Sequence, residues 1–189
     1  MTTIYTFNSK VLKNTVNDKW LIKKAAPLDE IQIGTQIWKT KNLAIDDGQG
    51  GIYTQTVNYG QGNVVEYYYT WEAAVRVAAS IPGWHLPSQT EWNTLGTAVG
   101  GFTTAGTKLK STYGWYNNTN GTDDYGFAAF PAGIRNSSSF IFLGDSVYFW
   151  TNRSVSDTDA YCYYISTGGS MNGAPYAKSR GQSVRLIKD

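Results

Sequence analysis

The spacing of apolar residues changes twice along the chain. Apolar and polar residues alternate between positions 31 and 38 around Gly34, which is typical of a β-hairpin. Helical spacing follows between positions 71 and 99, and beyond Phe102 it gives way to short apolar stretches separated by glycine and polar residues. Helices followed by a series of short strands predict an α+β domain.

Two amphipathic helices are predicted in this stretch. Thr70 is a suitable N-cap for a helix over residues 71–80, and Ser88 with Glu91 has the spacing of a capping box that begins a helix ending near position 99. Two glycines end the second helix. Helical spacing places Trp71, Ala74, Val75 and Ala78 on the buried side of the first helix, and Trp92, Leu95 and Val99 on that of the second.

A rigid turn joins the two helices at residues 81–92. Pro82 and Pro87 restrict φ on either side of Trp84 and His85. We expect Trp84 and Trp92 to be core anchors, because each can bury a large apolar area. His85 is the one histidine of the chain, and its apolar neighbours favour a core histidine hydrogen-bonded to the backbone over a catalytic base.

The remaining strands are predicted from short apolar runs. Residues 106–111 predict a short strand before a long loop, residues 140–150 two strands broken at Gly144, and residues 183–187 a closing strand. Residues 1–28 predict two or three short strands, which form either an extra sheet packed on the main domain or a segment for attachment or oligomerisation. We therefore divide the chain into this small N-terminal β segment and a main domain over residues 29–189.

Composition and charge argue against several functional classes. The net charge is +2 and Lys and Arg form no dense run, so no nucleic-acid partner is expected. No apolar run is long enough for membrane insertion, and the first residues lack the pattern of a signal peptide. The protein is therefore expected in the cytoplasm, or outside the cell by a route such as lysis within a particle.

Candidate chemistry is sparse. Cys162 is the single cysteine and has no nearby base in the sequence, so we interpret it as a small packing side chain. The pair Asp46 and Asp47 could contribute to a calcium site, but one acidic pair favours a solvated loop. Asp123 and Asp124 are likewise interpreted as a loop end rather than a catalytic pair. No cofactor, metal or catalytic residue is predicted.

Several short motifs follow one another along the main domain. They are IGTQIW at 33–38, YTW at 69–71, GWHLPS at 83–88, GTKLK at 106–110, GFAAFPAG at 126–133, FW at 149–150 and GQSVR at 181–185. In this order they resemble the Fibrobacter succinogenes major paralogous domain family, a branch of the C-type lectin-like and formylglycine-generating-enzyme-like folds. The resemblance implies a C-type lectin-like domain with two helices and several short antiparallel strands.

The same family includes the variable proteins of diversity-generating retroelements, which are often receptor binders of phages or prophages. In those proteins, a stretch ending at a motif similar to GQSVR is diversified by mutagenesis at adenines. The corresponding stretch is residues 152–180, which is rich in Asn, Ser, Tyr, Asp and Gly. An ordinary loop would also be rich in Ser and Gly because these residues favour turns. The chain lacks the calcium-binding triplets of lectins and the cysteine pair of the oxidase branch.

These observations predict a non-enzymatic receptor-binding protein. Its partner would be a protein or glycan receptor on a target cell surface, and the chain itself would form a homo-oligomer or part of a phage tail. The expected location is then a virion, as in a phage tail, or the cytoplasm before release. The alternative is an undiversified carbohydrate-binding or adhesion module, and an oxidase of the formylglycine-generating type comes third. The candidate ligand-binding residues are Asn152, Arg153, Ser154, Ser156, Asp157, Asp159, Tyr161, Tyr163, Tyr164, Ser166, Ser170, Asn172 and Tyr176.

Tyrosine together with Ser, Gly and Asn is the mixture found in antibody paratopes. Strand alternation over residues 161–165 would put Tyr161, Tyr163 and Ile165 on one face, with Cys162 and Tyr164 on the other. We favour an inward Ile165. Alternation alone leaves open which of Tyr161 and Tyr163 packs and which contacts ligand.

Overall fold

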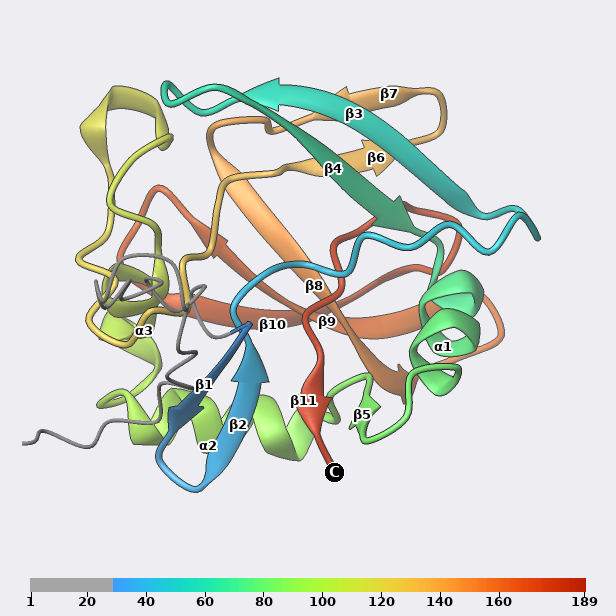
Figure 1. The fold of residues 1–189 in the computed structure, drawn as a ribbon, viewed down its shortest axis with the longest axis horizontal. Helices are drawn as coiled ribbons and strands as arrows, with labels where there is room; N and C mark the ends of the chain where they lie inside the picture. Colours follow the sequence, from blue (N-terminus) through green and yellow to red (C-terminus); the bar gives the residue numbers. More distant parts are fainter. Residues whose placement is uncertain (1–28) are drawn as a thin grey trace, which may run out of the picture.

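The computed structural model describes residues 29–189. Over these residues the chain forms three α-helices and four small sheets of antiparallel strands, so the predicted α+β class is confirmed. Figure 1 shows the sheets arranged around a long, strongly twisted central hairpin. The strands predicted within residues 1–28 lie outside the described residues.

One sheet joins the beginning of the described domain to its end. Strands β1 (Glu30–Ile33) and β2 (Gln36–Lys39) form the predicted hairpin, in which Gly34 adopts a φ of 60°. Strand β2 also pairs with β11 (Ile187–Lys188), and β11 pairs with β5 (Trp84–His85). The closing strand is therefore shorter than predicted, and Ser183 instead forms an isolated bridge with Phe149.

The first two helices agree with the prediction in position. Helix α1 (Trp71–Ala79) has Thr70 as its N-cap, and helix α2 (Gln89–Ala98) begins at the predicted capping box and buries the predicted residues. The buried side of α1 differs from the prediction, because the side chain of Val75 is 37% exposed. The residues that α1 buries are Ala73, Ala74, Val77 and Ala78.

A third helix, α3 (Phe102–Leu109), forms where a short strand was predicted. Its buried side consists of Ala105, Gly106 and Leu109. A Cβ at Gly106 would lie 2.6 Å from the carbonyl oxygen of Ser170, so this glycine lets the helix approach the neighbouring chain closely. The prediction was wrong because glycine and threonine lower helix propensity, whereas close packing determines the conformation here.

Two further hairpins cover the top of the domain in Figure 1. They are formed by β3 (Ile52–Asn58) with β4 (Asn63–Tyr69), and by β6 (Ile134–Asn136) with β7 (Ser139–Ile141). The first of these hairpins is absent from the sequence-based prediction. Its strands are rich in Ile, Val, Thr and Tyr and flank Gly60 and Gly62, which is a hairpin signal.

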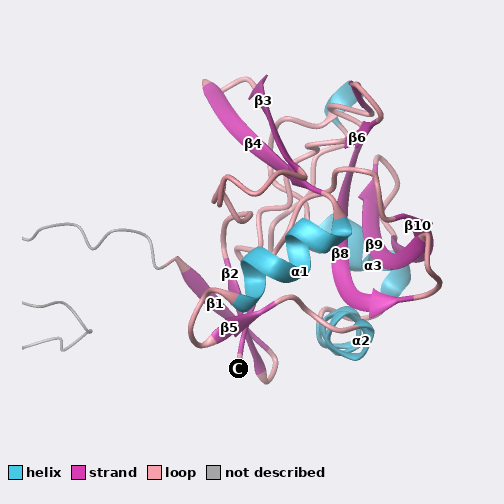
Figure 2. Ribbon diagram, turned by 90° about the vertical axis from the view of Figure 1, so that its right-hand side faces the viewer, coloured by secondary structure: helices cyan, strands magenta, loops and turns pink. Residues whose placement is uncertain are grey.

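The central sheet has the order β10-β9-β8 and comprises β8 (Ser146–Ser154), β9 (Asp159–Ser166) and β10 (Met171–Ala177). The predicted break at Gly144 is confirmed, since β8 begins just after it. Figure 2 shows α2 and α3 beside this sheet. The strands β8 and β9 contribute side chains to two separate hydrophobic clusters, so both of their faces are packed.

Candidate functional site

The candidate segment 152–180 runs from the end of β8 to the residues after β10. Its central strand, β9, sends alternate side chains into two cores. Ala160 and Cys162 pack into the cluster beside α1, whereas Tyr163 and Ile165 pack into the cluster beside α2. The inward Ile165 is confirmed, and Cys162 occupies a core position.

Tyr163 belongs to the core although it was one of the candidate ligand-binding residues. Only 3% of its surface is exposed, and its ring stacks on Trp92 at a centroid distance of 5.4 Å. Its hydroxyl donates to Asn93 Oδ1 at 2.5 Å. Burial raises the pKa of Tyr163 to about 12. This side chain cannot reach a ligand unless the core opens, because the face that alternation assigns to it is covered by α2.

The exposed candidates gather at the turn end of the β8–β9 hairpin. Residues 152–158 are all exposed, and Asp159 is half-buried. The connecting turn is nevertheless well defined, because the backbone N–H groups of Val155 and Ser156 both donate to the carbonyl oxygen of Asp159, at 2.9 and 3.0 Å. We call this set the hairpin surface and define it as Asn152, Arg153, Ser154, Ser156, Asp157, Asp159 and Tyr161.

Tyr161 supplies an aromatic platform at the edge of the hairpin surface. Its ring lies 5.3 Å from the Arg153 guanidinium, which also donates to the side chain of Gln89 on α2. A Cβ at Gly173 would lie 2.8 Å from the Tyr161 hydroxyl oxygen, so this glycine makes room for the ring. Tyr161 is half-buried, and it is the tyrosine of this face that remains accessible.

The opposite face carries the other candidate tyrosines. Tyr164 and Tyr176 contact Tyr148 of β8, with ring centroids 5.4 Å apart in both pairs. Tyr164 and Tyr176 are half-buried, whereas Tyr148 is 7% exposed. The Arg180 guanidinium lies 5.1 Å from the Tyr176 ring. Tyr148 is not among the candidate residues because it precedes residues 152–180.

The remaining candidates lie apart from the hairpin surface. Asn172 pairs with Tyr164 across β9 and β10, and its amide donates to Ser170 Oγ at 3.0 Å. Ser166 and Ser170 flank the β9–β10 connection and are half-buried. The fold therefore brings together about half of the candidates and distributes the others over a second face and the far end of the sheet.

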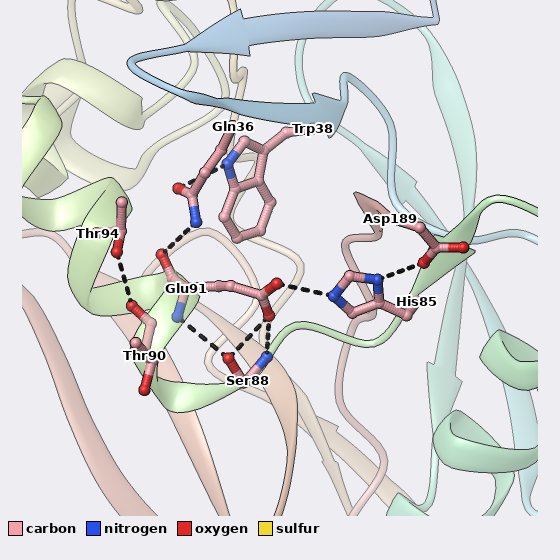
Figure 3. A network of polar contacts seen from close by, with 8 residues as sticks. All are labelled: Gln36, Trp38, His85, Ser88, Thr90, Glu91, Thr94 and Asp189. Carbon is pink, nitrogen blue, oxygen red and sulfur yellow. Dashed lines mark hydrogen bonds and ion pairs between the residues drawn. The ribbon is translucent and has the colours of Figure 1, made fainter.

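The turn at 81–92 differs from its prediction in two respects. His85 is not a core residue, because its side chain is 36% exposed, and it is bonded to carboxylates rather than to backbone. Its Nδ1 lies 2.7 Å from Asp189 and its Nε2 lies 2.8 Å from Glu91 (Figure 3). The prediction was wrong because the β5–β11 pairing brings the distant Asp189 beside this turn.

The two tryptophans of the turn also differ from each other. Trp92 is completely buried, whereas Trp84 is half-buried and lies beneath the Lys39 ammonium, 4.0 Å from the ring centroid. Trp84 belongs to the short edge strand β5, so one side of its ring faces solvent and lysine. The prediction of two core anchors is therefore confirmed for Trp92 and wrong for Trp84.

With this geometry in hand, the comparisons with known proteins identify a family. Residues 31–188 match the family model of the Fibrobacter succinogenes major domain (Fib_succ_major). The chain belongs to this family. A search of curated proteins and of solved structures found no match. In residues 29–189, no helix is long and apolar enough to cross a membrane.

Other candidate positions in the Fib_succ_major domain have structural partners. Asp47 accepts from Arg76 Nε at 2.7 Å, and this hydrogen bond lowers the pKa of the carboxyl group. Asp123 is half-buried and accepts from the backbone N–H of Ala128 at 2.8 Å, so it stabilises its loop, while Asp124 is exposed as predicted. No group of His, Cys, Asp or Glu suited to a metal ion occurs in residues 29–189.

Proposed function

We propose that this Fib_succ_major domain is a non-enzymatic binding domain whose receptor contacts the hairpin surface. The observation that carries the proposal is the continuous exposure of residues 152–158 beside the accessible Tyr161. The backbone of this surface is already ordered. The Thr151 Oγ1 hydroxyl donates to the Tyr161 carbonyl oxygen at 2.7 Å, and backbone hydrogen bonds close the turn. A preorganised surface loses less conformational entropy on binding.

The chemistry of the hairpin surface suits a protein or glycan receptor on a cell surface. Tyr161 offers a rigid ring, Arg153 a planar guanidinium, and the Asn, Ser and Asp side chains offer adaptable hydrogen bonds. Arg and Tyr are the residue types that most often dominate binding energy at interfaces. The pairing of β2 with β11, which closes the domain at its two ends, and the two flanking helices support a C-type lectin-like scaffold.

Two observations support a binding role over catalysis. Burial raises the pKa of the Cys162 thiol to about 12, so this side chain is a poor nucleophile and a poor oxidase thiol. His85, Glu91 and Ser88 resemble a catalytic triad in composition but not in order. Ser88 Oγ donates to Glu91 at 2.8 Å, so the carboxylate lies between the hydroxyl and the imidazole, and the base cannot activate the hydroxyl.

We further propose that the hairpin surface is diversified by a retroelement and acts in receptor binding by a phage or prophage. The support is the family resemblance together with the exposure of residues that can change without disturbing the core. The experiment is to sequence the DNA around the gene. We expect a near-copy of codons 152–180 beside a reverse-transcriptase gene, with adenine differences at codons for exposed residues. Absence of such a copy, or variation concentrated at buried Ala160 and Tyr163, would contradict the proposal.

A further inference from the structure

A cavity of about 290 Å³ lies between strand β4, the segment 40–44 and residues 113–130. In Figure 1 the β3–β4 turn is at the upper left, whereas the end of β8 is at the lower right, so this cavity is remote from the hairpin surface. Small-molecule sites have volumes of roughly 300–1,000 Å³. The cavity is therefore just below that range and suits one small group rather than an extended chain.

A buried carboxylate lines this cavity without an ionic partner. Glu66 is 6% exposed and forms no ion pair with any residue in 29–189. It accepts one hydrogen bond from the Tyr59 hydroxyl at 3.1 Å and one from Asn42 Nδ2 at 3.3 Å. Because a carboxylate has about four acceptor positions, two remain for a ligand. A buried charge is costly unless it is paired, so a cation would stabilise Glu66.

The two basic residues at the cavity are engaged elsewhere. The Arg185 guanidinium donates to Asn42 Oδ1 at 2.9 and 3.1 Å and to two backbone carbonyls, so Asn42 stands between it and Glu66. The Lys41 ammonium lies 3.5 Å from Asp29, and both side chains are largely exposed to solvent. Solvent screens the exposed pair. Glu66 therefore has no counter-ion in direct contact within the described residues, although the buried Arg185 guanidinium attracts it across Asn42. A cation in the cavity would be the positive charge that contacts the carboxylate directly.

Aromatic rings form the walls around this carboxylate. The ring centroids of Tyr59 and Phe130 lie 4.9 Å apart, and the Tyr113 ring meets the Phe130 ring edge-on with centroids 5.0 Å apart. At the rim, the side chains of Val64 and Val65 are 46% and 52% exposed. Ring faces attract cations, most strongly for Tyr and Trp where water is excluded, and the apolar rim suits the alkyl part of such a ligand.

We propose that this cavity binds an alkylammonium group, with Glu66 as its counter-ion and Tyr59, Tyr113 and Phe130 as its aromatic walls. The ammonium nitrogen lies toward the carboxylate, and its alkyl groups contact the rings and the two valines. The group belongs either to a free amine or to a lysine side chain of a partner. The site is independent of the receptor-binding role proposed for the hairpin surface.

The test titrates the full chain with choline and with its uncharged carbon isostere, dimethylbutanol, and follows backbone amide signals by NMR. We expect saturable shifts for choline in residues 40–44, 59–67 and 113–130, and at least about tenfold weaker binding of the isostere. A third titration with Nα-acetyl-lysine amide, whose side-chain ammonium is free, separates the two sources of ammonium. Binding of choline alone assigns the site to free quaternary amines, and binding of the lysine derivative assigns it to a partner side chain.

Two variants make the test specific. Glu66→Gln keeps the shape and removes the charge, so it should weaken choline binding about tenfold or more. Should Glu66→Gln fail to fold, Val65→Trp blocks the rim from an exposed position and should abolish binding. Val75→Trp, at an exposed valine on α1, is the matched control and should bind normally. Equal binding of choline and its isostere, unchanged binding in Glu66→Gln, or shifts elsewhere would overturn the proposal.

Discussion

The turn at 81–92 and the segment 152–180 both mix aromatic with polar residues, yet they use them differently. In the turn, Glu91 and His85 connect α2, β5 and the end of the described domain, and Trp92 fills the core. In the segment, the polar residues of the hairpin surface contact mainly solvent and one another. The two regions meet where Trp92 stacks on Tyr163. The boundary between scaffold and surface therefore runs through a single strand, β9, rather than between distant parts of the sequence.

Truncating the shared core residue should have the largest effect. Trp92 is fully buried and stacks on Phe149 and Tyr163, so Trp92→Ala removes contacts that hold both regions together. We expect the free energy of unfolding to fall by about 3–5 kcal/mol. Urea denaturation followed by circular dichroism measures this loss. Trp84→Ala is the matched variant and should cost clearly less, because Trp84 is half-buried. Equal losses of stability in the two variants would contradict the assignment of Trp92 to the core and of Trp84 to the partly exposed side of the turn.

The β9–β10 connection should tolerate the loss of its polar contacts less well than the hairpin surface does. Lys110 is 2% exposed, and its ammonium donates to the carbonyl oxygens of Thr119 and Thr167. Lys110→Met keeps the length but leaves these acceptors without a donor, so we expect a loss of about 1–3 kcal/mol. Thermal and urea unfolding of this variant, with Lys41→Met at an exposed lysine as control, test whether the β9–β10 connection is anchored here.

The contacts of His85 with Asp189 and Glu91 should make the stability of the protein depend on pH. Burial disfavours the charged imidazole, but hydrogen bonds with Asp189 and Glu91, together with their charges, outweigh it and raise the pKa of His85. The stabilisation is then complete below the unfolded pKa of about 6.5 and is lost as pH rises through the higher folded pKa. We expect the melting temperature to fall between about pH 6 and pH 8.

Glu91 should add a second pH dependence, at acidic pH, and His85→Gln is the control for the first. Burial raises the pKa of Glu91, but hydrogen bonds from Ser88 and His85 outweigh it and lower that pKa overall. Its stabilisation is present above the unfolded pKa of about 4.3 and is lost as pH falls through the folded value. Scanning calorimetry across this range should show a maximum near mildly acidic pH. The slope above pH 6 should be reduced in His85→Gln, and an unchanged slope would place its origin elsewhere.

Local patterns in the sequence predicted the elements whose conformation depends on neighbours in the chain. The β1–β2 hairpin, the cap at Thr70 and the capping box of α2 all depend on residues close in sequence, and all are confirmed. The α+β class and the inward Ile165 follow from periodicity and are also confirmed. These features survive because tertiary packing agrees with local preference.

The predictions that were wrong concern contacts between distant residues. Helix α3 depends on the close approach of Gly106 to Ser170, and the bonds of His85 depend on the arrival of Asp189. Alternation indicated that Tyr161 and Tyr163 share a face but could not indicate that α2 covers one of them. The candidate site was therefore predicted in outline, whereas its division between surface and core required the fold.

The most direct test of this division is the stability of a chain with an altered hairpin surface. The variant combines Asn152→Ala, Arg153→Ala, Ser154→Ala, Ser156→Ala and Asp157→Ala. Exposed substitutions usually change stability by no more than about 0.5 kcal/mol each. We therefore expect the free energy of unfolding in urea to remain far closer to that of the native chain than to that of Trp92→Ala. A loss as large as the one caused by Trp92→Ala would show that residues 152–157 belong to the scaffold, and would contradict the account.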